Sequence, residues 1–99
     1  MGLLDGKVIV VTGGGHGIGR AYCVGIAREG GTAVVADIDE QAAAGVAKAI
    51  QDSGGKTLAT KVDVANFPSC QAMAQKALAA FGKIDGLINN AAIFMSVPA

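Results

Sequence analysis

A group of glycines directly after an apolar run is the part of the sequence best suited to chemistry. The segment Thr12 to Gly19 contains five glycines, follows the apolar run Val8 to Val11 and precedes a helical pattern. Because glycine leaves the backbone bare, a pyrophosphate can approach main-chain N–H groups at the positive N-terminus of the following helix. The segment therefore predicts a phosphate cradle. The alternative is that the glycines form only a tight turn.

Two acidic positions farther along the chain also suit a nucleotide. Asp37 lies 18 positions after Gly19, close to the spacing at which a carboxylate accepts from the ribose hydroxyls of a dinucleotide. The alternative for Asp37 is a carboxylate at a helix N-terminus, a role that Asp39 can also fill. Asp63 follows a later apolar run, and from its position alone it fits a turn or cap as well as a nucleotide contact.

Four predicted strands alternate with three predicted helices and position these residues. The strands are expected at Val8 to Thr12, Thr32 to Ala36, Lys56 to Val62 and Gly86 to Asn89. The order β-α-β-α-β-α-β predicts an α/β fold, a Rossmann-type doubly wound parallel sheet with right-handed crossovers. Since the carboxyl ends of parallel strands share one edge, the glycine segment, Asp37, Asp63 and the residues from Asn89 onward should converge there.

The helices are predicted from apolar spacing and from capping residues. The expected apolar face of the first helix, which begins near Ile18, consists of Ala21, Tyr22, Gly25 and Ile26. Asp39 is expected to cap the second helix and Asn66 the third, which should end at Gly82. The face of the third helix is expected to comprise Cys70, Met73, Ala77, Leu78 and Phe81. The first two helices should cover one face of the sheet and the third helix the other.

The composition excludes several classes of protein. The 99 residues are 52% hydrophobic and 16% charged, with eight basic and eight acidic side chains, so we expect a folded chain without a nucleic-acid footprint. Cys23 and Cys70 lack metal-ligand spacing, so no metal site is predicted and both are expected to be reduced core thiols. The sequence shows no targeting segment or membrane span, which indicates a cytoplasmic protein with a small-molecule partner.

The glycine spacing resembles that of a known family. The general fingerprint G-x-G-x-x-G is not met, but Thr12-Gly13-x-x-x-Gly17-x-Gly19 resembles the T-G-x-x-x-G-x-G motif of the short-chain dehydrogenase/reductase family. Asn89-Asn90-Ala91-Ala92 resembles the family's N-N-A-G segment, with Ala92 in place of glycine. The resemblance covers essentially the whole chain. It implies the NAD-binding half, residues 1–99, of a Rossmann domain in an oxidoreductase that transfers hydride to or from an alcohol or ketone.

The resemblance also implies a set of cofactor contacts. These are pyrophosphate contacts (Gly13, Gly17, Gly19), a ribose contact (Asp37), adenine contacts (Asp63, Val64) and inner-ribose contacts (Asn89, Asn90, Ala91, Ala92). Further cofactor-binding positions without an assigned part of the dinucleotide are Gly15, His16, Ile18 and Ile38. The Asp37 carboxylate should repel a 2′-phosphate, and Ile38 adds no compensating charge, which favours NAD over NADP. His16 is the complication, because NADP-using members often carry a basic residue at this position and a histidine can be charged near neutrality.

The resemblance further implies catalytic groups that these 99 residues do not contain. The family uses a tyrosine, a lysine four positions later and a serine, all after the fourth strand, so we expect a fragment of a longer enzyme that is inactive alone. His16 and Tyr22 are not expected to be catalytic. Family members commonly form homotetramers. The alternatives are a non-catalytic dinucleotide-binding module or sensor, and another Rossmann ligand such as an adenosine-containing methyl donor.

Overall fold

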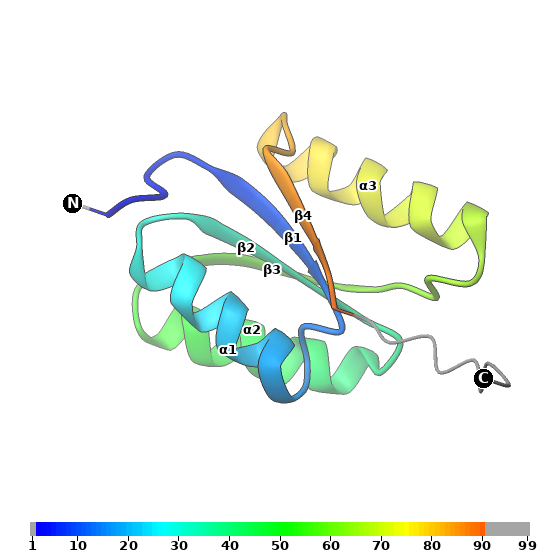
Figure 1. Ribbon diagram of the computed structural model, residues 1–99, viewed down its shortest axis with the longest axis horizontal. Coiled ribbons are helices and arrows are strands. Elements are labelled where there is room, and N and C mark those ends of the chain that lie inside the picture. The colour runs from blue at the N-terminus through cyan, green and yellow to red at the C-terminus, as the bar shows by residue number, and fades with distance from the viewer. Residues whose placement is uncertain (1, 91–99) are drawn as a thin grey trace, which may run out of the picture.

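The predicted alternation of strands and helices is confirmed in the computed structural model, which describes residues 2–90 (Figure 1). The elements are β1 (Val8–Thr12), α1 (Gly17–Arg28), β2 (Thr32–Asp37), α2 (Glu40–Asp52), β3 (Lys56–Lys61), α3 (Phe67–Phe81) and β4 (Gly86–Asn89). The four strands form one parallel sheet in the order β3-β2-β1-β4. This is the expected Rossmann-type arrangement.

The helices cover the two faces of the sheet as predicted (Figure 1). α1 and α2 pack on the face that carries Val11 and Val35, whereas α3 packs on the face that carries Val10 and Val34. These four valines are fully or almost fully buried, because consecutive side chains of a strand point to opposite faces and both faces are covered. The covered faces therefore account for the continuous apolar runs of β1 and β2.

The ends of two helices follow their sequence signals. The Asp39 side chain accepts from the Ala42 N–H at the start of α2, and Asn66 accepts from the Ser69 N–H at the start of α3. Gly82 ends α3 with φ 78°, a left-handed conformation that glycine adopts without steric cost. The three signals confirm the predicted starts of α2 and α3 and the predicted end of α3.

The predicted apolar face of α1 is confirmed at Ile26 but wrong at Ala21 and Tyr22, which are exposed. The buried residues of α1 are Gly19, Cys23 and Ile26, whereas Ile18 and Tyr22 are 65% and 44% exposed. Gly19 approaches the loop after β1 so closely that it fixes the rotation of the helix, which turns Ile18 and Tyr22 away from the sheet. On α3 the Leu78 side chain is likewise 45% exposed, although its neighbour Ala77 is buried.

β4 lies at the edge of the described sheet, where it pairs with β1. The Val8 N–H donates to the Asp85 carboxylate at 2.7 Å, and the Asp85 N–H donates to the Val8 carbonyl at 2.7 Å. The hydrogen bond from the Val8 N–H has the largest effect in lowering the pKa of Asp85, and the interaction with the Lys83 ammonium lowers it further. Leu87 on the same strand is 60% exposed, so β4 presents an apolar side chain at this edge of the described sheet.

The two cysteines differ in their surroundings, and we predict that they differ in reactivity. Cys23 is fully buried between α1 and the sheet, and burial raises the pKa of its thiol to about 12, whereas Cys70 is only half-buried. Since the thiolate is the reactive form, iodoacetamide at pH 8 should modify Cys70 and leave Cys23 intact. Peptide mass spectrometry measures this, with urea-unfolded protein as the control in which both react. Equal labelling in the native state would contradict the packing of Cys23.

Candidate functional site

The loop between β1 and α1 requires glycine at several positions. Gly13 and Gly17 have φ values of 67° and 50°, in the left-handed region. A Cβ at Gly19 would overlap the carbonyl oxygen of Gly13, and one at Gly14 would lie 3.0 Å from the Cys23 sulfur. The Gly14 N–H donates to the Ala36 carbonyl at 3.1 Å, which ties the loop to the end of β2. The glycines therefore do more than form a turn, because they let the helix start approach the strand ends.

The N-terminus of α1 is capped differently from those of α2 and α3. His16 occupies the cap position of α1 but makes no side-chain capping hydrogen bond, and the first turn contains no acidic residue. The first intrahelical bond runs from the Arg20 N–H to the His16 carbonyl, so the N–H groups of Gly17 to Gly19 precede the hydrogen-bonded turns. Such N–H groups at the positive end of a helix suit an anionic group such as a phosphate.

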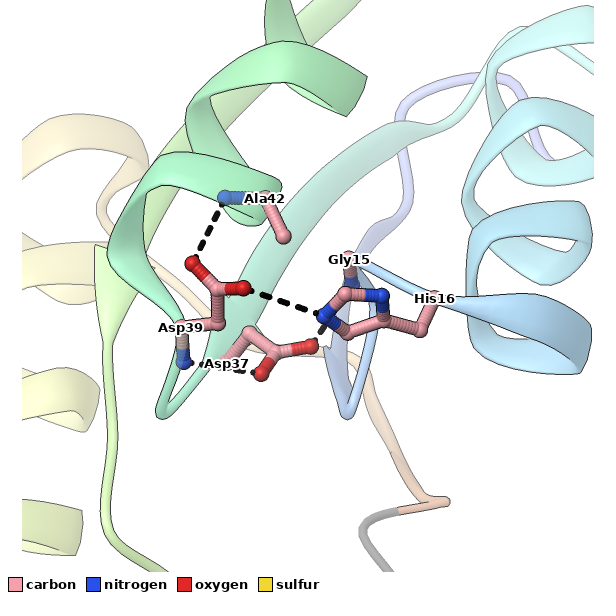
Figure 2. Close-up of polar contacts among 5 residues, drawn as sticks. All are labelled: Gly15, His16, Asp37, Asp39 and Ala42. Carbon is pink, nitrogen blue, oxygen red and sulfur yellow. Dashed lines mark hydrogen bonds and ion pairs between the residues drawn. The ribbon is translucent and has the colours of Figure 1, made fainter.

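Asp37 holds this loop against the start of α2. Asp37 is only 5% exposed. Its two carboxylate oxygens accept hydrogen bonds from the backbone N–H groups of Gly15 and Asp39, both at 2.9 Å (Figure 2). A carboxylate oxygen can accept more than one hydrogen bond, so these contacts fix the orientation of Asp37 and leave acceptor capacity. The sequence placed Asp37 at this edge, but its contact with Gly15 depends on the packing of the loop and was not predicted.

Across the loop, His16 contacts Asp39. The His16 Nε2 lies 3.3 Å from the Asp39 Oδ2, and the two side chains are 65% and 50% exposed (Figure 2). The hydrogen bond from the Ala42 N–H is the main reason that the pKa of Asp39 lies below its usual value, and His16 lowers this pKa as well. The contact joins the glycine loop to the start of α2. The sequence predicted Asp39 as a cap but gave no sign of its second partner.

The end of β4 is joined to the end of β1 through polar side chains. The Thr12 hydroxyl donates to the Asn89 side-chain oxygen at 2.9 Å and accepts from the Asn90 N–H at 3.1 Å. The Asn90 amide donates to the Gly13 carbonyl at 3.5 Å. These bonds connect the glycine loop to the N-N-A segment. Ala91 and Ala92 lie outside the described residues.

Asp63 takes part in the turn between β3 and α3. Its side chain accepts from the Ala65 N–H at 3.0 Å, and its own N–H donates to the Ser69 hydroxyl at 2.9 Å. The turn interpretation of this residue is therefore confirmed, while a contact with adenine stays a prediction. Val64 packs against the core on the α3 face.

The structure brings most of the predicted site residues to the carboxyl edge of the sheet. Gly13 to Gly19, Asp37 and Asn90 are linked by hydrogen bonds, and the exposed Ile18 and Ile38 belong to the same loop ends. A groove lined mainly by Val24, Ala27, Arg28, Ala49 and Ile50 lies between the late turns of α1 and α2. That groove belongs to the opposite end of the helices and contains none of the predicted site residues.

The part of the chain that the structure describes has neither a metal-binding cluster nor a membrane-spanning helix. Within residues 2–90, no three His, Cys, Asp or Glu side chains are grouped so that they could hold a metal ion. No helix in this part of the chain is both long and apolar enough to cross a membrane.

Comparison with known proteins identifies relatives over nearly the whole chain. Residues 7–99 match the family model described as short chain dehydrogenase. The chain is 46% identical to the 2,5-dichloro-2,5-cyclohexadiene-1,4-diol dehydrogenase of Sphingobium indicum over an alignment of 90 residues. The alignment covers 91% of this chain and 35% of the relative. The chain thus spans about a third of the length of the curated relatives that it matches.

Solved structures agree with the sequence relatives. A hydroxysteroid dehydrogenase from Escherichia coli superposes with a TM-score of 0.88 at 39% identity, over 90% of this chain and 38% of that protein. A short chain dehydrogenase/reductase from Burkholderia phymatum, solved in complex with NAD, gives a TM-score of 0.83 at 41% identity, over 88% of this chain and 31% of its own. The sequence motif, the parallel sheet and these matches lead to one assignment: the chain belongs to the short chain dehydrogenase family.

Proposed function

We propose that the protein is an NAD-dependent oxidoreductase that acts on an alcohol or ketone, and that residues 1–99 form its cofactor-binding half-domain. The observation that carries the proposal is the hydrogen-bonded edge at which Asp37 is fixed beside an uncapped helix N-terminus. The Burkholderia phymatum relative was solved with NAD, which supports the same cofactor here. The substrate class rests on relatives named as dehydrogenases of a diol and of hydroxysteroids.

The residues of the edge fit a nicotinamide dinucleotide. A Cβ at Gly15 or Gly19 would meet other protein atoms within 3 Å, so these glycines let the loop and the helix start pack closely, whereas a Cβ at Gly17 would meet no heavy atom within 4 Å. The backbone at Gly17 is therefore open to the approach of a pyrophosphate. Gly13, Gly17, Gly19 and Ile18 would hold the pyrophosphate, and Asp37 would accept from the adenosine ribose. Ile38, Asp63 and Val64 would border the adenine, and Asn89 to Ala92 the inner ribose. When bound, the dinucleotide supplies or takes up a hydride at its nicotinamide ring.

NAD is favoured over NADP because the ribose position is negatively charged. Asp37 is 5% exposed and is held by two backbone N–H groups, so it cannot turn away from a 2′-phosphate without losing both bonds. Ile38 is 63% exposed and apolar, so it offers the phosphate no charge. Burial and charge therefore both oppose a phosphorylated ribose at this position.

Calorimetric titration of the intact protein with NAD and NADP tests the proposal. We expect binding of NAD with at least about tenfold preference over NADP, which corresponds to about 1.4 kcal/mol. Reduction of NAD in the presence of secondary alcohols, followed at 340 nm, tests the reaction. Binding of neither dinucleotide would refute the cofactor assignment. Tight NAD binding without turnover on a broad panel of alcohols and ketones would favour a dinucleotide sensor.

A further inference from the structure

We propose that Asp39 is a second determinant of cofactor selectivity, because its contact with His16 keeps the imidazole from serving a ribose 2′-phosphate. This inference rests on the proposed function and concerns the same edge. It starts from the 3.3 Å contact between the His16 Nε2 and the Asp39 Oδ2, which lies beside the Asp37 carboxylate (Figure 2). His16 is the basic side chain that belongs to the glycine loop itself.

The two oxygens of Asp39 have separate tasks. Oδ1 accepts from the Ala42 N–H at 3.1 Å and caps α2, whereas Oδ2 faces His16. The cap can be supplied by any side-chain oxygen, so it does not require a negative charge. The negative charge and the second carboxylate oxygen of Asp39 instead interact with His16. An uncharged capping residue would therefore cap α2 equally well, but it would not give His16 an anionic partner.

The balance of charge around the pair favours an unphosphorylated ribose. Asp37 faces it from the end of β2, and Glu40 follows Asp39 in the first turn of α2. The basic groups of the neighbouring elements are Arg20 on α1 and Lys61 at the end of β3, opposite Asp37 in register, and both are exposed. The ion pairs within residues 2–90 are His16–Asp39, Lys48–Asp52 and Lys83–Asp85, so neither exposed base is paired with Asp37 or Asp39.

A 2′-phosphate at this position would meet two carboxylates and an imidazole that already has an anionic partner. Asp37 repels the phosphate directly. Asp39 repels it as well, and also occupies the Nε2 that would otherwise donate to it. In this arrangement His16 does not recruit NADP, although its position in the loop alone would favour that cofactor. The selectivity then depends on Asp39 as well as on Asp37.

Asp39→Asn in the intact protein separates the charge from the cap, because the asparagine oxygen still accepts from Ala42. Calorimetry should show NADP binding about tenfold tighter and NAD binding unchanged within about twofold, as expected for the removal of one charge near a phosphate. In a His16→Gln background the same substitution should tighten NADP binding only about threefold. Asp52→Asn removes the same charge from an exposed pair on α2 and should leave both affinities unchanged.

Three results would overturn the inference. They are an unchanged ratio of NADP to NAD affinity in Asp39→Asn, an equal gain with and without His16, and an equal effect of Asp52→Asn. Asp39→Ser, whose hydroxyl also caps a helix, provides a second uncharged variant if the asparagine protein does not fold. Failure of the wild-type protein to bind NAD would refute the proposed function instead. NAD binding with unaltered selectivity in both variants would refute only the role of Asp39.

Discussion

Replacing Gly19 with alanine is expected to abolish dinucleotide binding and to lower the free energy of unfolding by about 3 kcal/mol. The added Cβ would overlap the Gly13 carbonyl oxygen and lie 2.6 Å from the Asn90 side-chain nitrogen. Neither neighbour can yield freely, since Gly13 has a φ of 67° and Asn90 is bonded to Thr12 and Gly13. The helix start must therefore move away from the loop, and its N–H groups no longer face the phosphate position.

Gly25→Ala is the matched control on the same helix. A Cβ at Gly25 meets no heavy atom within 4 Å, so the alanine adds helix propensity without a clash. We expect it to raise the free energy of unfolding by about 1 kcal/mol and to leave the NAD affinity unchanged. Urea unfolding and calorimetry of the two variants measure these effects. Wild-type NAD affinity in Gly19→Ala would contradict the proposed phosphate position.

Asp37→Asn is expected to weaken NAD binding about 30-fold, or about 2 kcal/mol, and to affect NADP much less. An amide retains one acceptor oxygen, but its NH₂ group cannot accept from the second backbone N–H that the carboxylate now satisfies. Because the residue is 5% exposed, that N–H becomes unsatisfied, and the free energy of unfolding should fall by about 2 kcal/mol.

The two aspartates are distinguished by which cofactor responds. Asp37→Asn should act mainly by weakening NAD, whereas Asp39→Asn should act mainly by strengthening NADP. Asp52→Asn again serves as the control for loss of a carboxylate on an exposed surface. An Asp37→Asn protein with unaltered NAD affinity and a normal urea midpoint would show that this carboxylate is neither a ribose ligand nor a brace for the loop.

Much of the fold was predictable because local signals and burial agree. The apolar runs of β1 and β2 are continuous since both faces of these strands are covered, and Asp39, Asn66 and Gly82 mark helix ends by their own chemistry. The glycine segment was predicted only to admit a pyrophosphate, and its close packing between loop and helix became visible in the structure. The convergence of the glycine loop with Asp37 then followed from parallel strands alone.

The errors and omissions come from contacts between elements. The apolar pattern of α1 placed Tyr22 on the buried face, but the approach of Gly19 to Gly13 sets the rotation of the helix and buries Cys23 instead. The His16–Asp39 contact and the bond from the Val8 N–H to Asp85 join residues far apart in the sequence. No periodicity or cap signal specifies such pairs, because they depend on how the loops meet after the sheet has formed.

A crystal structure of the intact protein with NAD would show whether the dinucleotide lies at the carboxyl edge of the sheet. We expect the adenosine ribose hydroxyls to lie within hydrogen-bond distance of the Asp37 carboxylate, with the pyrophosphate at the N–H groups of Gly17 to Gly19. His16 and Asp39 should remain in contact in that complex. A dinucleotide bound elsewhere, for example in the groove between α1 and α2, or a ribose without contact to Asp37, would contradict this placement of the cofactor.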